Sequence, residues 1–224
     1  MLNAQSLAQF PLFASLLPAD IEPLLPHLKE RRFRRGQVLF VEGELGAQVY
    51  FIISGQVKLG NVLPDGEEQI SDWCGPGDSI GEFVLLEPSP YPATAEVVQE
   101  STMLVLHNGD MPHILATYPQ LALSLIRVLS KRLRFTQEFV RILTSRSTAG
   151  ILAALLLRLA RPATRQGQPI YVDGGLTHRD LAAMIGTSRE CVNRSLNNWK
   201  RAGIIAARED KIEILKPHEL ADWP

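Results

Sequence analysis

The stretch "THRDLAAMIGTSRECVNRSLNNWKRAG" at residues 177–203 decides the fold of the C-terminal part of the chain. Leu181 and Ile185 are spaced for the buried face of a first helix. Ala182 is small, as the close crossing of two helices requires, and Gly186 supplies the permissive backbone of a tight turn. The stretch therefore predicts two helices that cross closely around a short turn.

The second helix of this stretch has one apolar and one polar face. Thr187 and Glu190 match a Thr-x-x-Glu capping box, which predicts that the helix begins beside them. The apolar side chains expected to face the core are Val192, Leu196 and Trp199. Those expected to point outward are Arg189, Glu190, Asn193, Arg194 and Asn197.

The outward set contains residue types that read base edges in the major groove of DNA. Arg pairs with guanine, Glu accepts from cytosine, and Asn bridges adenine. For a lone helix, a solvated face with a surface ion pair between Glu190 and Arg194 would be the simpler interpretation. The small Ala, the Gly turn and the capping box fall in register, however, and together they favour a helix that reads DNA.

The segments on either side of residues 177–203 have simpler patterns. "TAGILAALLLRLA" at 148–160 predicts a helix, and "RPATRQGQPIYVDGG" at 161–175 predicts a loop with a short strand. "GIIAAREDKIEILKP" at 203–217 has two short apolar runs around a charged turn, which is typical of a β-hairpin.

Residues 118–146 predict one long helix, because they contain no Gly and their only Pro falls in the first turn. Two adjacent stripes follow three- and four-residue steps and therefore need two partners. One partner can be the rest of the chain, and the other is most simply a second copy of the same helix. A monomer that buries both stripes is the alternative. The stripes are Leu121, Leu125, Val128, Arg132, Phe135 and Phe139, and Leu129, Leu133, Thr136, Val140 and Leu143.

Residues 33–108 have the character of strands. Runs rich in β-branched and aromatic residues are separated by many glycines, and "PDG" at 64–66 is a good hairpin turn. Short strands at intervals of 8–12 residues predict an antiparallel barrel or sandwich, preceded by a short helical segment at 18–28. We expect an α+β protein with three parts, at residues 1–117, 118–146 and 147–224.

The net charge of −1 hides an uneven distribution. Residues 1–117 hold 6 basic and 15 acidic side chains, residues 118–146 hold 6 and 1, and residues 147–224 hold 11 and 8. An acidic first half and a basic second half indicate two different roles, with any polyanion bound by the second.

Several classes of protein and of site are disfavoured. Cys74 and Cys191 are too few for an iron–sulfur cluster, and buried structural Cys is the expected role of Cys74. Haem would need an axial ligand, and His107 and His113 are available, but a lone His is more often a polar surface residue or part of a turn. Residues 33–106 contain no His, which argues against a cupin-like enzyme. We therefore expect no catalytic residue and no metal site.

The sequence also carries signals about location. No Lys or Arg precedes Lys29, so the start lacks the basic region of a secretory signal. The most apolar run, at 149–160, is too short to span a bilayer. A cytoplasmic protein without membrane contact is the simplest interpretation.

Three segments, in this order, resemble the cyclic-AMP receptor protein / fumarate–nitrate regulator (CRP/FNR) family of bacterial transcription regulators. They are "GQVLFVEGELGAQVYFIISGQVKL" at 36–59, "GPGDSIGEFVLLEPSPYPATAEVVQEST" at 75–102 and "TSRECVNRSLNNWKRAGII" at 187–205. The resemblance implies an N-terminal double-stranded β-helix (an effector-binding-like β-roll), a long dimerisation helix and a C-terminal winged helix-turn-helix. It also implies a homodimer that binds double-stranded DNA, and RNA polymerase as a partner if the protein is an activator.

The resemblance assigns roles in DNA binding. The family's Arg-Glu-x-x-x-Arg pattern for guanine-containing half-sites falls on Arg189, Glu190 and Arg194, and Ser188 would contact a phosphate. Ser195 departs from the apolar residue that the family usually has there. The full set of expected DNA-binding residues is Ser188, Arg189, Glu190, Asn193, Arg194, Asn197, Lys200, His178 and Arg179.

The resemblance is weaker at the effector pocket. Gly81 and Glu82 match the pair that meets the ribose of a cyclic nucleotide, and Thr136 and Gln137 lie where the long helix contacts the base. Tyr91, however, stands at the position of the Arg that holds the phosphate, and Pro92 at that of a small polar residue. A buried phosphate without its guanidinium loses a charge-assisted bond, so binding of a cyclic nucleotide in the usual way is disfavoured. A different effector, or none, remains open.

Two interpretations of the function follow. The first is a homodimeric regulator that reads a pseudo-palindrome. The alternative is a small-molecule-binding signalling module that acts mainly through protein partners, which predicts DNA association without sequence preference.

Overall fold

The computed structural model describes residues 4–14, 16–85, 87–145, 147–161, 170–172, 175–208 and 211–223. The chain forms two compact units. Unit 1 is Met1–Val62 with Ser71–Phe135, and unit 2 is Leu63–Ile70 with Thr136–Pro224. Most of the loop predicted after Arg161 and the tip of the C-terminal hairpin at 209–210 lie outside the described residues.

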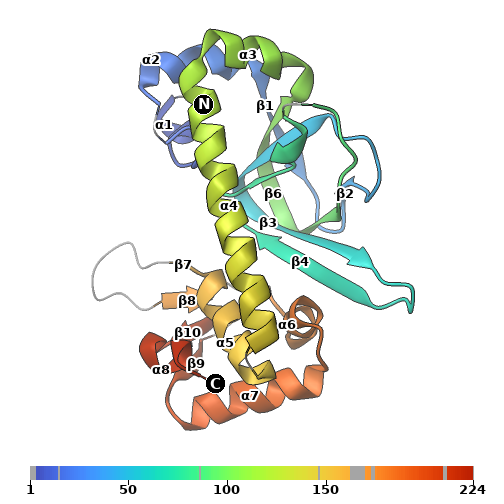
Figure 1. The fold of residues 1–224 in the computed structure, drawn as a ribbon, viewed down its shortest axis with the longest axis vertical. Coiled ribbons are helices and arrows are strands. Elements are labelled where there is room, and N and C mark those ends of the chain that lie inside the picture. Colours follow the sequence, from blue (N-terminus) through green and yellow to red (C-terminus); the bar gives the residue numbers. More distant parts are fainter. Residues whose placement is uncertain are drawn as a thin grey trace. The chain divides into compact units, whose positions relative to one another are not determined.

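Unit 1 is built around an antiparallel β-roll, as the sequence predicts (Figure 1). Strand β6 pairs with β1, β2 and β3, and β5 also pairs with β3, so the main path is β1-β6-β3-β4. Irregularities in the β3–β6 pairing between Ile52 and Val57 interrupt the ladder at Gly55, which has a left-handed φ of 89°. The strands are β1 (Leu28–Phe33), β2 (Val38–Phe40), β3 (Gln48–Val62), β4 (Glu68–Cys74), β5 (Ser79–Ile80) and β6 (Thr94–His107).

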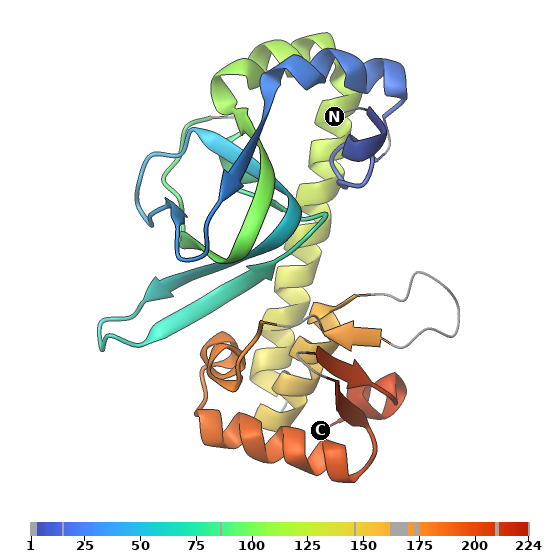
Figure 2. The same ribbon diagram turned by 180° about the vertical axis from the view of Figure 1, so that it is seen from behind.

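Short helices cover one end of the roll (Figure 2). The helical segment predicted at 18–28 is α2 followed by the 3-10 helix η1. Phe10 and Phe13, near the start of the chain, pack against Phe51 of β3 with ring centroids 5.4 and 5.2 Å away, which closes the core. The helices are α1 (Ala4–Leu7), α2 (Pro18–Ile21), η1 (Glu22–His27), η2 (Glu82–Val84), η3 (Asn108–Asp110) and α3 (Met111–Thr117).

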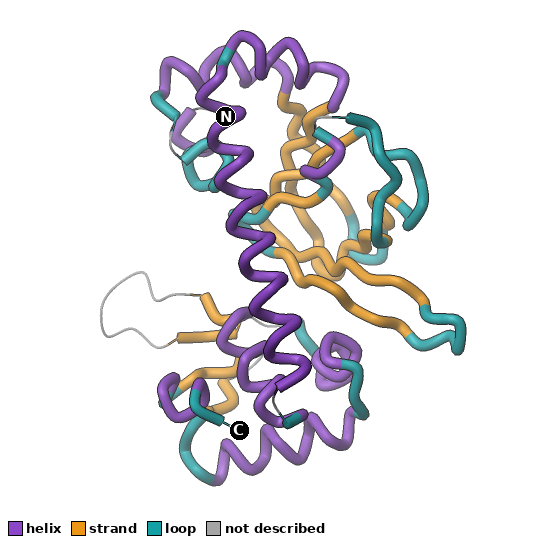
Figure 3. The backbone as a smooth tube through the Cα atoms, viewed as in Figure 1, coloured by secondary structure: helices purple, strands orange, loops and turns teal. Residues whose placement is uncertain are grey.

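Helix α4 (Pro119–Ser145) is the single long helix that the sequence predicts (Figure 3). Its first part belongs to unit 1, where Leu121 and Leu125 are buried in the core of the roll. Leu129, from the second predicted stripe, also packs against this core. Leu123, Ile126, Leu133 and Val140 form an exposed seam on α4.

The exposed seam has a regular spacing. Ile126, Leu133 and Val140 are seven residues apart, and Leu123 precedes Ile126 by three. This is the a/d spacing of a coiled-coil seam, and two of its members, Leu133 and Val140, belong to the second predicted stripe. Of the other predicted stripe residues, Phe139 lies under the guanidinium of Arg158, 5.7 Å from its ring centroid. The side chains of Phe135 and Leu143 lie outside the described set.

Unit 2 is a winged helix-turn-helix, as predicted. Its sheet has the order β7-β8-β10-β9, and β9 and β10 form the predicted hairpin. Trp199 is completely buried and makes an edge-to-face contact with Trp223 at 5.7 Å. The elements are α5 (Thr148–Leu159), β7 (Ala160–Arg161), β8 (Ile170–Val172), α6 (His178–Ile185), α7 (Arg189–Arg201), β9 (Ile205–Arg208), β10 (Lys211–Ile214) and α8 (Pro217–Ala221).

Candidate nucleic-acid interface and effector site

The turn between α6 and α7 has the predicted geometry. Gly186 adopts a left-handed φ of 66°, and the N–H of Thr187 donates to the carbonyl of Ala182 at 3.1 Å. Ala182 is buried, consistent with a close crossing of α6 and α7. Ile185 is only half-buried, whereas Met184 joins Leu181 in the buried face of α6.

The predicted cap of α7 is wrong by one residue. The N-cap is Ser188, not Thr187, and its Oγ accepts from the N–H of Cys191 at 3.2 Å. The capping box of this motif lies instead at the start of α6, between Thr177 and Asp180. The backbone N–H of Glu190 and then the Ser188 hydroxyl lower the pKa of the Glu190 carboxyl, which stays ionised at the start of α7.

The two faces of α7 are separated as the sequence predicts. Val192, Leu196 and Trp199 are buried, and they hold the helix in place although Ser195 is only half-buried. Asn197 is half-buried and donates from Nδ2 to Oδ1 of Asn193 at 3.2 Å. The exposed side chains of the expected DNA-binding set on this helix and its cap are Ser188, Arg189, Glu190, Asn193, Arg194 and Lys200.

The simpler interpretation of the polar face is a solvated surface on which Glu190 and Arg194 pair. Within the described ranges, no ion pair joins these two side chains, and Arg189 has none either. The arginines at the start of α7 are therefore available to an external anion or base edge.

The start of α6 adds the cation of Arg179 and the ionisable imidazole of His178. Arg179 is exposed and His178 is half-buried. Burial, and then the charges of Lys200 and Arg189, lower the pKa of His178. His178 thus lies close enough to Arg189 and Lys200 on the helix-turn-helix for their charges to act on it.

The hairpin beside α7 carries cations that the sequence reasoning missed. Nε of Arg208 donates to Oε2 of the buried Glu213 at 2.8 Å. Nζ of Lys211 lies 5.9 Å from the centroid of the Tyr171 ring. The sequence did contain a signal for these cations, because Arg208 and Lys211 lie on either side of the charged turn of the predicted hairpin.

In unit 1, the predicted effector residues begin with Gly81. Its φ of 82° is left-handed, and a Cβ at this position would come within 2.9 Å of the Gln48 carbonyl oxygen. The backbone turn before η2 therefore requires glycine, and this turn sets the position of Glu82, the first residue of η2.

Glu82 is 3% exposed, and one of its two carboxylate oxygens is paired within the chain, whereas Oε2 is buried without a hydrogen-bond partner among the described residues. Its Oε1 accepts from Nη1 of Arg132 at 2.8 Å and from the Ser79 hydroxyl at 3.1 Å. Nη2 of Arg132 donates to the Ser79 carbonyl at 2.9 Å. Burial raises the pKa of Glu82 despite the attraction of Arg132. We call this set of contacts among Ser79, Glu82 and Arg132 the bracket.

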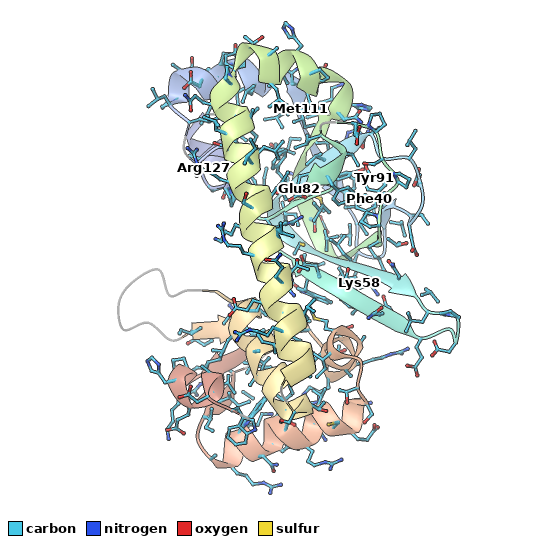
Figure 4. The ribbon with its side chains drawn as sticks, viewed as in Figure 1. Phe40, Lys58, Glu82, Tyr91, Met111 and Arg127 are labelled. Carbon is cyan, nitrogen blue, oxygen red and sulfur yellow. The ribbon has the colours of Figure 1, made fainter. Side chains whose placement is uncertain are left out.

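Tyr91 is also buried, and it lies beside Phe40 (Figure 4). The two rings stack with centroids 3.7 Å apart and planes 11° from parallel. The Tyr91 hydroxyl donates to the carbonyl of Gln48 at 2.8 Å and accepts from its N–H at 3.2 Å. Pro92 is exposed, and its carbonyl accepts from the side chain of Asn61 at 3.1 Å.

The remaining predicted effector residues, Thr136 and Gln137, are exposed on the part of α4 that belongs to unit 2. The structure does not bring them together with Glu82 and Tyr91 within one unit. Among the residues it describes, no cluster of three or more His, Cys, Asp or Glu could hold a metal ion.

No helix in the described part of the chain is both long and apolar enough to cross a membrane.

Comparison with known proteins identifies two families along the chain. Residues 30–118 match the cyclic nucleotide-binding domain, and residues 152–223 match the Crp-like helix-turn-helix domain. The chain is 33% identical over 216 residues to the "CRP-like cAMP-activated global transcriptional regulator" of Mycobacterium tuberculosis, covering 96% of each protein. It is 29% identical over 204 residues to the "Cyclic AMP receptor protein" of Thermus thermophilus, covering 91% of this chain and 92% of that protein.

Solved structures agree with these sequence relatives. The catabolite activator protein of Thermus thermophilus matches with a TM-score of 0.55 and 29% identity, over 94% of this chain and 98% of that chain. FixK2 of Bradyrhizobium japonicum shares the fold with a TM-score of 0.75 at 22% identity, over 86% of this chain and 95% of that chain. From the β-roll to the winged helix-turn-helix, the chain belongs to the CRP/FNR family of bacterial transcription regulators.

Proposed function

We propose that this chain is a homodimeric DNA-binding protein of the bacterial cytoplasm that reads a pseudo-palindromic site through α7. The observation that carries the proposal is the separation of the two faces of α7. Buried Val192, Leu196 and Trp199 hold the helix, while Arg189 and Arg194 are exposed and make no ion pair among the described residues. A helix held in this way can insert its first turns into the major groove.

Each exposed residue has a distinct role in the proposal. Arg189 and Arg194 read guanine, Glu190 accepts from cytosine, and Asn193, held by Asn197, reads a neighbouring base. Ser188, Lys200, His178 and Arg179 contact phosphates, which position the protein without specifying sequence.

The exposed seam of α4 supports the homodimer. Leu133 is 60% exposed, and the neighbouring members of the seam have similar exposure. A heptad seam of apolar residues is stabilised when it pairs with an identical helix. A twofold dimer then presents two copies of α7 to half-sites about one helical turn apart. RNA polymerase is the expected partner if the protein activates transcription. The protein has no catalytic role in this proposal.

The test is selection of bound DNA from a random pool by the full-length protein, with and without candidate effectors. We expect an enriched pseudo-palindrome, and we expect Arg189→Ala protein to lose the preference at one position of each half-site. Binding that depends on salt but returns no preferred palindrome would overturn the proposal. It would favour the alternative of a signalling module that acts through protein partners.

A further inference from the structure

We propose that the β-roll of this chain is closed to cyclic nucleotides, and that the bracket fixes α4 to the roll in place of a ligand. If the proposed DNA-binding function holds, it follows that operator binding does not require a cyclic nucleotide. The family implies such a ligand, but the residues present do not fit it.

The phosphate of a cyclic nucleotide carries a negative charge, and its burial requires cationic or strong hydrogen-bond donors. Tyr91, at the position of the family's Arg, offers none. Its single O–H is donated to the Gln48 carbonyl, and its ring is held against Phe40. Burial raises the pKa of the Tyr91 hydroxyl, so the side chain is neutral. Turning it toward a phosphate would break both hydrogen bonds and the ring stack.

Pro92 removes a second donor, because proline has no backbone N–H. Its carbonyl faces the amide of Asn61 and not a ligand hydroxyl. The two positions that would bind the phosphate in the family therefore supply neither a charge nor a free donor.

Arg132 is a cation of this region, and Glu82 and Ser79 already bind it. If Arg132 turned to a phosphate, it would leave the buried carboxylate of Glu82 without its guanidinium. Further negative charge lies nearby, since burial, and then the charges of Asp72 and Asp78, raise the pKa of the Cys74 thiol. The three carboxylates of Glu82, Asp72 and Asp78 outnumber the one guanidinium of Arg132, so an added anion would be repelled.

The bracket performs a structural task that needs no ligand. It joins α4 to β5 and η2 through one ion pair, from Arg132 to Glu82, and one hydrogen bond, from Arg132 to the Ser79 carbonyl. The Ser79 hydroxyl also donates to Glu82 and holds the carboxylate in place. Because Glu82 is almost fully buried, the pair is formed in low dielectric and holds the helix in a defined position. The orientation of this part of α4 is thus fixed by residues of the chain itself.

The experiment has two arms, both on the full-length protein. In the first, calorimetry and thermal shift are measured with cyclic AMP and cyclic GMP at millimolar concentration. We expect no saturable heat and no shift for the natural chain, and a measurable gain of binding for Tyr91→Arg/Pro92→Ser, which restores a cation and a donor. Saturable binding of either nucleotide by the natural chain would overturn the closed roll, whether or not the protein binds DNA.

In the second arm, operator affinity is measured by fluorescence anisotropy on the selected palindrome. We expect cyclic AMP to change the Kd of the natural chain by less than about twofold. Replacing the bracket by apolar residues, Glu82→Leu/Arg132→Leu, should leave the chain folded but weaken operator binding by about tenfold. Lys58→Leu/Glu96→Leu, which removes the β3–β6 ion pair at 3.1 Å, is the matched control and should not weaken it.

The outcomes are distinguishable. If the natural chain binds no palindrome at all, the proposed function fails while the nucleotide arm still tests the roll. If the natural chain binds the palindrome only with cyclic AMP, or if the bracket variant binds as tightly as the natural chain, the inference is wrong and the proposed function stands.

Discussion

Helix α7 and the effector site of the β-roll differ in where they place the residues that the family uses. On α7, Arg189 and Arg194 are exposed, and separate residues such as Trp199 hold the helix in place. In the roll, Glu82 and Tyr91 are themselves buried and are bound by other side chains and backbone groups. A side chain cannot easily serve both as a packed element of the core and as a free ligand for another molecule. This difference supports the two proposals, that α7 reads DNA and that the chain uses the family's effector positions for internal packing.

The largest expected effect tests the buried half of α7. Trp199→Ala should destabilise unit 2 by about 3–5 kcal/mol, because it removes a large buried side chain and leaves a cavity. Urea unfolding followed by circular dichroism measures the change, with the exposed Asn198→Ala as the control. A decrease of less than about 1 kcal/mol in the free energy of unfolding would mean that the buried contacts of Trp199 do not hold α7 in place.

The next effect tests whether the bracket is structural. Arg132→Ala should cost about 3 kcal/mol near neutral pH, since it leaves Glu82 buried and uncompensated. Burial already raises the pKa of Glu82, so its carboxyl takes up a proton as the pH falls, and the penalty should shrink. The measurement is the difference in unfolding free energy between variant and natural chain at about pH 7.5 and about pH 5. A difference that does not depend on pH would contradict a charged pair.

A third prediction separates the two kinds of contact made by α7. Arg189→Ala should lose about 1–3 kcal/mol of binding free energy and relax the preference at one base position. Lys200→Ala should weaken all sequences alike and reduce the slope of affinity against salt concentration. Binding to a panel of single-base variants of the palindrome measures both. If both variants lose affinity equally for every sequence of the panel, Arg189 does not read a base.

A smaller effect concerns the turn that aims α7. Gly186→Ala should destabilise unit 2 by about 1 kcal/mol, because an L side chain is strained at a φ of 66° even though no atom lies within 4 Å of the added Cβ. Gly109 is the matched control, since it also has open space but no left-handed φ. Equal thermal stability of the two Ala variants would show that the conformation of the turn costs nothing.

The smallest effect is a pH dependence of DNA binding. The pKa of His178 is lowered in the free protein, by burial first and then by Lys200 and Arg189. A phosphate beside the ring favours the protonated form, so binding should take up a proton, and affinity should rise as the pH falls below about 6.5. The gain should be about 0.5 kcal/mol and should be absent in His178→Gln. If the affinity of the natural chain falls as the pH is lowered, and that of the variant does not, then DNA binding does not add a proton to His178.

The fold was largely predictable because its signals are local. The Gly186 turn, the alternation of the strands and the period of α4 each follow from near neighbours in the sequence. The cap of α7 was misplaced by one residue because Thr187 and Ser188 are both good N-caps. Only the backbone geometry at Ser188, with φ −80° and ψ 150°, decides between them.

The contacts at the effector site could not be predicted, because they join residues far apart in the chain. Arg132 stood in a predicted stripe of α4, but nothing in its neighbours indicated Glu82, fifty residues earlier, as its partner. Likewise the sequence shows Tyr91 in place of an Arg, but not that its ring stacks on Phe40. The sequence did not show which stripe of α4 meets which partner, because periodicity alone does not indicate which side of a helix its own domain covers.

Strand β6 has a consequence for the synthesis of the protein. It is the last strand of the roll in sequence, yet β1, β2 and β3 all hydrogen-bond to it. While the ribosome makes the first ninety or so residues, these earlier strands therefore lack their common partner, and their edges stay open to wrong pairings. The roll can close only after His107 has left the exit tunnel. A pause in translation shortly before that point would prolong the interval in which the nascent chain needs a chaperone.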